Sequence, residues 1–271
     1  MKTPPPLEDR VLPAVVQADK DRDHRFLVFA GVVLVAIALG FKSELVAPNQ
    51  VWGLAAGLAV LAVAAVLGYL TIERRVPPIE HFVPAALGAL ALAGLALLMP
   101  RFWEYALAAA AFGVCFYAAA QLDYRHLLDQ SKPGHWIVQE AVMVLAVAAC
   151  FLVILTATLD LPIRLAGIFA VAASASYRTF RVMGRPMAPR RALLFSVFVG
   201  QVVTFCAWAM TANLYIPEGF FAVILLLIWY VNRGFVRHTV DETLTRNVVI
   251  EYGIFVLLIA YLFFISRQPA H

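Results

Sequence analysis

Ionisable side chains able to act on a ligand stand near the ends of several long apolar segments. Glu140 and Glu251 each lie about one helical turn into such a segment, so both are expected at a similar depth in a bilayer. Because a charge inside lipid costs roughly 2.5–3.5 kcal/mol on insertion scales, both carboxylates need compensation. Arg178, Arg181 and Arg233 stand at matching segment ends and can supply it. These five residues predict either a polar cleft for a lipid headgroup, a phosphate or a metal, or a set of ion pairs that holds helices together.

A second group of candidates consists of polar residues on or between the apolar segments. Asp123, His126 and Asp129 follow one another at intervals of three and share one face of a helix. Acid and imidazole groups at this spacing can bind a metal or form an acid–base pair, but solvated side chains are the simpler interpretation. Gln201, near the middle of another segment, is expected to hydrogen-bond to a neighbouring helix. The cysteines and histidines do not have the spacing of a metal site, and the sequence leaves the question of a cofactor open.

The stretch from Arg178 to Arg191 is strongly basic, with five arginines and two prolines. Guanidinium groups bind phosphate oxygens bidentately, so anionic lipid headgroups are the expected partner of this stretch. The excess of basic residues in cytoplasmic loops of membrane proteins explains the same pattern without any ligand. The lone Gly184 does not make a phosphate-binding loop.

The composition identifies the surroundings that these residues require. Of 271 residues, 63% are hydrophobic and 14% are charged, and the mean hydropathy is +0.83. Soluble domains are about half apolar and about a quarter charged. We therefore expect an all-α, polytopic integral membrane protein that has the lipid bilayer around it. The net charge of +4 comes from bases in short loops, so nucleic-acid binding is not indicated.

Nine apolar segments approach the roughly 20 residues that a membrane-spanning helix needs. They are residues 26–41, 51–72, 82–99, 102–121, 136–158, 161–177, 192–212, 216–231 and 248–265. Residues 1–25 are predicted to be a cytoplasmic, partly disordered arm, residues 26–266 a single transmembrane domain, and residues 267–271 a short external tail.

The distribution of basic residues predicts the orientation. With the N-terminus in the cytoplasm, 17 of the 21 lysines and arginines fall on the cytoplasmic side. Only Lys42, Arg101, Arg164 and Arg267 fall outside it. Nine spans then place the C-terminus outside. The first residues lack the pattern of a secretory signal, and the plasma or inner membrane of the cell is the expected location.

Two local motifs make predictions about packing. Gly53 and Gly57 form a GxxxG pair, which favours close packing inside the bundle, with a homodimer contact as the alternative. Thr239 and Glu242 have the spacing of a capping box and predict that the last helix starts there.

The motifs of common enzymes are missing from the sequence. It contains no H-E-x-x-H, no G-x-S-x-G and no paired aspartate-rich motifs. Three classes of function stay open. The first is a non-catalytic accessory or assembly subunit of a membrane complex, with another membrane protein as its partner. The second is an enzyme acting on a lipid or isoprenoid at the cytoplasm-facing cleft. The third, a small-molecule transporter, is disfavoured because the middle of the segments contains almost no charge.

Overall fold

The computed structural model describes residues 24–42, 51–71, 77–128, 136–182, 186–213 and 216–266. These residues form nine α-helices, one short 3₁₀ helix and no strand, which confirms the all-α prediction. The elements are α2 (His24–Phe41), α3 (Val51–Leu70), η2 (Ile79–Phe82), α4 (Val83–Leu98), α5 (Phe102–Leu128), α6 (Trp136–Thr156), α7 (Leu161–Val182), α8 (Pro189–Asn213), α9 (Glu218–Val240) and α10 (Arg246–Ser266). Each predicted apolar segment corresponds to one α-helix. Helix α2 begins within the predicted arm, whose residues 1–23 lie outside the described part of the chain, as does the predicted tail.

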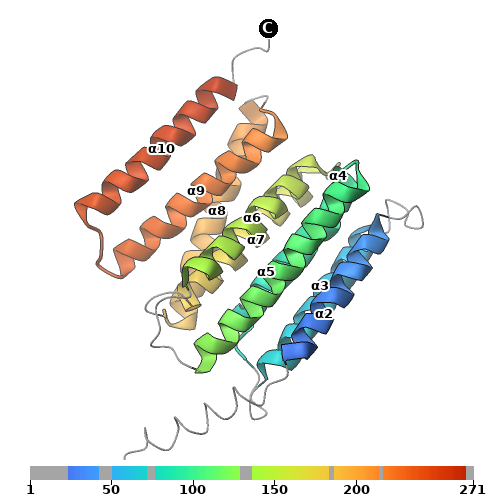
Figure 1. Ribbon diagram of the computed structural model, residues 1–271. Helices are drawn as coiled ribbons and strands as arrows, with labels where there is room; N and C mark the ends of the chain where they lie inside the picture. Colours follow the sequence, from blue (N-terminus) through green and yellow to red (C-terminus); the bar gives the residue numbers. More distant parts are fainter. Residues whose placement is uncertain are drawn as a thin grey trace, which may run out of the picture.

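Six of the described helices are long and apolar enough to cross a membrane, which indicates a membrane-embedded protein. Their apolar stretches are Gly53–Leu70, Ile79–Leu98, Phe102–Arg125, Ile137–Thr156, Pro189–Ala212 and Glu218–Val240. The helices lie side by side with similar directions, and α10 and the α2–α3 pair stand at opposite edges in Figure 1. Helix α2 is short, and α7 carries three arginines. That α2, α7 and α10 also span the bilayer stays a prediction.

The buried apolar side chains form two clusters that share α4. The N-terminal core joins α2, α3, α4 and α5 around residues such as Leu58, Leu92 and Tyr105. The C-terminal core joins α6, α7, α8 and α9, and it also takes Leu87 and Ala91 from α4. Helix α4 therefore connects the two halves of the bundle.

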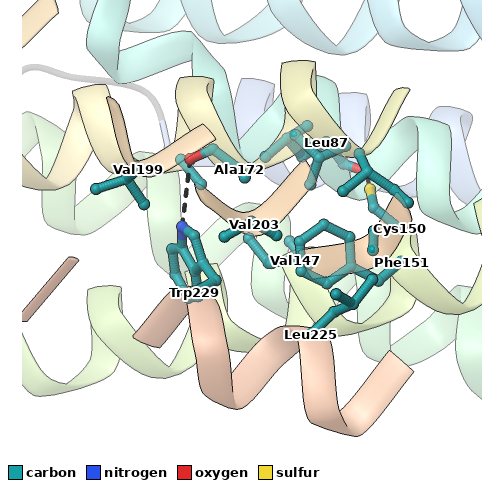
Figure 2. Packing of buried hydrophobic residues seen from close by; sticks show 14 of the residues in the cluster. Leu87, Val147, Cys150, Phe151, Ala172, Val199, Val203, Leu225 and Trp229 are labelled. Atoms are coloured by element: carbon teal, nitrogen blue, oxygen red, sulfur yellow. Dashed lines mark hydrogen bonds between the residues drawn. The ribbon is translucent and has the colours of Figure 1, made fainter. Parts of the chain in front are cut away.

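The C-terminal core is built around large side chains from α6 and α9 (Figure 2). Val147 and Phe151 of α6 and Leu225 and Trp229 of α9 are fully buried. The Trp229 Nε1 donates a hydrogen bond to the Ala172 carbonyl oxygen of α7 at 3.2 Å. A polar edge that finds a partner in this way lets an indole ring lie deep inside an apolar core.

Close approach between helices depends on small residues at particular positions. Helix α4 has Pro84 in its first turn, where the missing N–H is tolerated, and ends just before Pro100. Between them Gly94 faces Val153 of α6, and a Cβ atom added at Gly94 would overlap the valine side chain.

The GxxxG pair of α3, Gly53 and Gly57, makes no such close approach to another helix. A Cβ added at Gly53 or Gly57 would meet nothing within 4 Å, so the prediction that this pair packs inside the bundle is wrong.

Helix α10 packs on α9 at the edge of the bundle (Figure 1). Its partly buried side chains recur at helical spacing: Val248, Tyr252, Phe255, Ile259 and Leu262.

The prediction that Thr239 and Glu242 form a capping box at the start of α10 is wrong. Helix α9 continues through Val240, and α10 begins only at Arg246. The predicted motif instead lies at the C-terminal end of α9, where Asp241 caps the helix.

Candidate functional site

Charged side chains from five elements meet at one end of the bundle. We call the following residues the ionic cluster: Glu80 of η2, Asp123 of α5, Glu140 of α6, Arg178 and Arg181 of α7, and Arg233 of α9. The position of these residues near helix ends explains their common depth. Asp123, Arg178 and Arg233 lie in last turns, whereas Glu140 lies in the first turns of its helix.

Asp123 and Arg178 form the centre of the ionic cluster. Their side chains are 1% and 0% exposed, and two hydrogen bonds of 3.0 and 2.8 Å join the guanidinium to the carboxylate oxygens. The Gln139 Nε2 donates to Asp123 Oδ1 at 2.9 Å, and His81 Nδ1 lies 3.5 Å from Oδ2. Arg178 Nη1 also donates to the Glu80 carbonyl oxygen at 3.0 Å. The pair therefore connects α5, α6, α7 and η2.

Arg181 holds the segment before α8 against η2. Its Nε and Nη2 atoms each lie 3.0 Å from Glu80 Oε1. Its Nη1 donates to the Met187 carbonyl oxygen at 2.7 Å. One arginine thus joins α7, η2 and the chain that leads into α8.

The third ion pair joins α6 to α9 through Glu140 and Arg233. Arg233 Nη1 donates to Thr179 Oγ1 at 3.1 Å, and its guanidinium lies 4.4 Å from the centre of the Trp229 ring. A cation over an indole face is attracted by the ring, which adds to the ion pair. Next to it, Arg237 Nη1 donates to the Thr179 carbonyl oxygen at 3.1 Å.

The ionic cluster contains three carboxylates and three arginines, each carboxylate paired with one arginine. Removing charges from water is costly, and an ion pair compensates only when its geometry is good and its remaining hydrogen bonds are made. The bidentate contact at Asp123 meets this condition. Each ion pair joins two different elements, so the arrangement as it stands serves to hold helices together.

The structure brings together only part of the predicted cleft. Arg233 pairs with Glu140 as the depth argument allows, but Arg178 and Arg181 pair with Asp123 and Glu80. Glu251 is exposed on α10 and has no ion pair among the described residues.

The structure describes only part of the weaker candidates. Asp123 is in the ionic cluster, but the side chain of His126 and all of Asp129 lie outside the described residues. Within the described ranges, no three or more Cys, His, Asp or Glu residues are grouped as a metal would require.

Glu80 belongs to the ionic cluster, and His81 and Gln139 contact its Asp123, although sequence reasoning did not single these three residues out. A signal for the first two was present. Glu80 and His81 follow Pro77 and Pro78 and stand directly before an apolar segment, at the same depth as the predicted arginines. Gln139 had no such signal, because an uncharged polar residue beside Glu140 is common at a helix start.

Gln201 lies in a shallow groove between α7 and α8. The groove is lined by Leu165, Ala166, Phe169, Gln201, Thr204, Phe205 and Trp208. The Gln201 side chain is exposed and has no hydrogen-bond partner among the described residues, unlike the expectation of a bond to a neighbouring helix. Thr204 instead donates to the Gly200 carbonyl oxygen of its own helix at 2.8 Å. The polar amide therefore faces outward.

Comparison with known proteins gives one family. Residues 136–266 match the model of DUF5656, described as a protein of unknown function. No curated protein and no solved structure matches the chain. The matched stretch runs from α6 to α10 and includes Arg178, Arg233 and Gln201. It does not include Asp123 or α4, so the C-terminal half of this chain completes its ion pairs and its core with residues from outside the matched stretch.

Proposed function

We propose that this chain is a non-catalytic accessory subunit of a membrane complex, and that the Gln201 groove contacts a helix of its partner. The observation that carries the proposal is the outward-facing amide of Gln201. Twelve residues of α8 precede it and twelve follow it. It therefore lies about 18 Å from either end of the helix, near the middle of a bilayer of about 30 Å if α8 crosses it directly.

An amide in this position favours a partner. It offers two N–H donors and a carbonyl acceptor, and lipid tails can satisfy none of them. Polar side chains on membrane helices therefore promote association with other helices. Phe205 and Trp208, on the same side of α8, are 65% and 47% exposed and widen the surface that a helix could cover.

The ionic cluster supports the non-catalytic part of the proposal. Each of its three carboxylates is paired with an arginine. The ionic cluster therefore holds helices together and leaves no unpaired acid among these residues for a substrate. The competing idea of a lipid-modifying enzyme needs Glu140 and Glu251 in one cleft. Glu251 is exposed on α10, outside the cluster.

Replacing Gln201 with leucine is expected to weaken the complex about 3- to 30-fold, because interhelical polar contacts are worth roughly 0.6–2 kcal/mol. Leucine keeps the helix and is compatible with lipid. The measurement is native mass spectrometry of protein extracted in mild detergent from its own membranes, comparing the fraction bound to a stoichiometric partner. Phe198→Leu provides the control, because Phe198 is exposed on α8 outside the groove.

Two results would contradict the proposal. Equal partner occupancy in the wild type and the Gln201→Leu variant would show that the amide is not part of the contact. A complex that contains only a second copy of this chain would replace the accessory-subunit proposal with a homodimer.

We further propose that all nine helices span the plasma or inner membrane, with the N-terminus in the cytoplasm. The bias of 17 of 21 basic residues toward one side supports this orientation. Arg190 and Arg191 are exposed at the start of α8, unlike the paired Arg178 and Arg181. They are the part of the basic stretch that we assign to anionic lipid headgroups.

A cysteine introduced at Ala188 tests the topology. Ala188 is exposed in the short connection between α7 and α8, and nine spans place it in the cytoplasm. In a variant whose three native cysteines are replaced by alanine, a membrane-impermeant thiol reagent should label this position only after the cells are opened. Labelling of intact cells would overturn the nine-span map.

A further inference from the structure

A narrow apolar cavity of about 250 Å³ lies among α4, α5 and α6. Its lining contains eight alanines and Gly88, so the helices leave space where larger side chains would close it. Helix α4 packs against both α5 and α6. The cavity shares no residue with the Gln201 groove.

The cavity is long and has one polar end. On α5 its lining extends from Ala108 to Asp123, a separation of fifteen residues that corresponds to about 22 Å along the helix axis. At the end near the ionic cluster it reaches His81 and Asp123, whose side chains are both nearly fully buried. Nearly all the rest of the lining is apolar. Such a shape fits a hydrocarbon chain that carries a small polar head.

The cavity opens sideways between α5 and α6. Ala111 of α5 and Leu145 of α6 line it and are exposed on the outer surface of the bundle. Because lipid surrounds a membrane bundle, a molecule dissolved in the bilayer can enter by this route without passing through water. This access favours a ligand that is itself a membrane component.

The charges at the polar end decide which head fits. Asp123 already has Arg178 as its counter-ion, so the cavity offers no unpaired charge to bind an ion. A phosphate or carboxylate head would face the Asp123 carboxylate, and like charges at short distance in an apolar site repel strongly. A cationic head would have to compete with the bidentate arginine. An uncharged hydroxyl or carbonyl can share hydrogen bonds there without either penalty.

We propose that this cavity binds a neutral, single-chain lipid such as a long-chain alcohol, with its hydroxyl at His81 and Asp123 and its chain between α5 and α6. The proposal adds a ligand to a protein whose suggested role as a subunit rests on a different face. The small side chains of the lining are then explained as the space that the chain of the lipid occupies.

The test uses the full chain in lipid nanodiscs with a diazirine-bearing hexadecanol as the probe. After irradiation, peptide mass spectrometry should place the adducts on the lining of the cavity. The variant Ala111→Phe should lower the adduct yield about tenfold, which corresponds to about 1.4 kcal/mol of binding free energy. Its matched control is Ala110→Phe, because Ala110 is exposed on the same helix but does not line the cavity.

Cys115 supplies a second measurement that needs no variant. It is a free cysteine that lines the cavity, whereas the free Cys206 on α8 does not, and both are partly buried. Hexadecanol should slow the alkylation of Cys115 by an apolar maleimide and leave that of Cys206 unchanged. Hexadecyl phosphate should protect Cys115 less than the alcohol does.

Three outcomes would overturn the proposal. Adducts spread evenly over the outward faces of all helices would mean ordinary contact with lipid. Equal loss of adduct in Ala110→Phe and Ala111→Phe would show that the probe does not bind in the cavity. Equal protection of Cys115 by the alcohol and the phosphate would refute the neutral head. None of these results depends on the partner complex, so this proposal and the subunit proposal can fail separately.

Discussion

Replacing Arg178 with methionine is expected to lower the free energy of unfolding by about 3–5 kcal/mol, the usual result of removing one partner of a buried ion pair. Methionine has a similar length but cannot compensate the charge of Asp123. That carboxylate is 1% exposed and would keep only Gln139 and His81 beside it. The Glu80 carbonyl oxygen would also lose its hydrogen bond from the guanidinium. The measurement is unfolding in mixed detergent micelles, followed by circular dichroism.

Two comparisons separate this effect from a general loss of charge. Arg190→Met removes an exposed arginine and should change stability by less than about 0.5 kcal/mol. The double variant Asp123→Leu/Arg178→Met removes both charges and should be more stable than Arg178→Met alone, because an unpaired buried charge costs more than no pair. A single Arg178→Met variant with wild-type stability would show that the pair is exposed to water.

Replacing Gly94 with alanine is expected to destabilise the protein by about 1–3 kcal/mol, as inserting an extra carbon into a packed core usually does. The added Cβ would overlap the side chain of Val153, where α4 passes α6. Valine is branched at its own Cβ and has few alternative rotamers, so the helices themselves would have to separate. The measurement is again detergent unfolding, with helix content checked beforehand.

Gly53→Ala is the matched control for this substitution. Gly53 also lies in an apolar helix, but an added Cβ there meets nothing within 4 Å, so the variant should lose no stability. Val153→Ala in the Gly94→Ala background should restore part of the loss by making room. If the two glycine variants are equally stable, α4 and α6 do not approach each other as closely as the structure has them.

The positions of the helices could be predicted from the sequence because they depend on local properties. Each apolar segment is long, and charged or polar residues, glycine or proline lie near most of its ends. The depth of Glu140, Arg178 and Arg233 was predictable for the same reason, since depth follows from position along a helix. Their placement at one end of the bundle agrees with that reasoning.

The choice of partners was not predictable in this way. It depends on which helices are neighbours and on how each is rotated about its axis. Helix α7 presents Arg178 to α5 and η2, so its partner is Asp123, at a sequence distance of 55 residues. Glu251 shows the effect of rotation. It stands next to Tyr252, which faces α9, but one residue along a helix is a turn of about 100° and leaves the carboxylate exposed.

Gln201 illustrates a different difficulty. Its position near the middle of a long apolar segment was evident from the sequence, but its direction was not, because almost every neighbouring residue in α8 is apolar. In soluble proteins a hydrophobic stripe marks the buried face of a helix. A helix that is apolar all round gives no such stripe, so its buried and lipid-facing sides cannot be told apart by this signal.

The separation of Asp123 from Arg178 along the chain imposes an order on biosynthesis. At about 5–20 residues per second, the ribosome adds Asp123 roughly 3–11 s before Arg178. During this interval the end of α5 carries a carboxylate whose arginine does not yet exist. Helices α2 to α5 can pack together in the meantime around their own core. The packing of α7 against α5 then pairs Asp123 with Arg178 and joins the second half of the chain to the first.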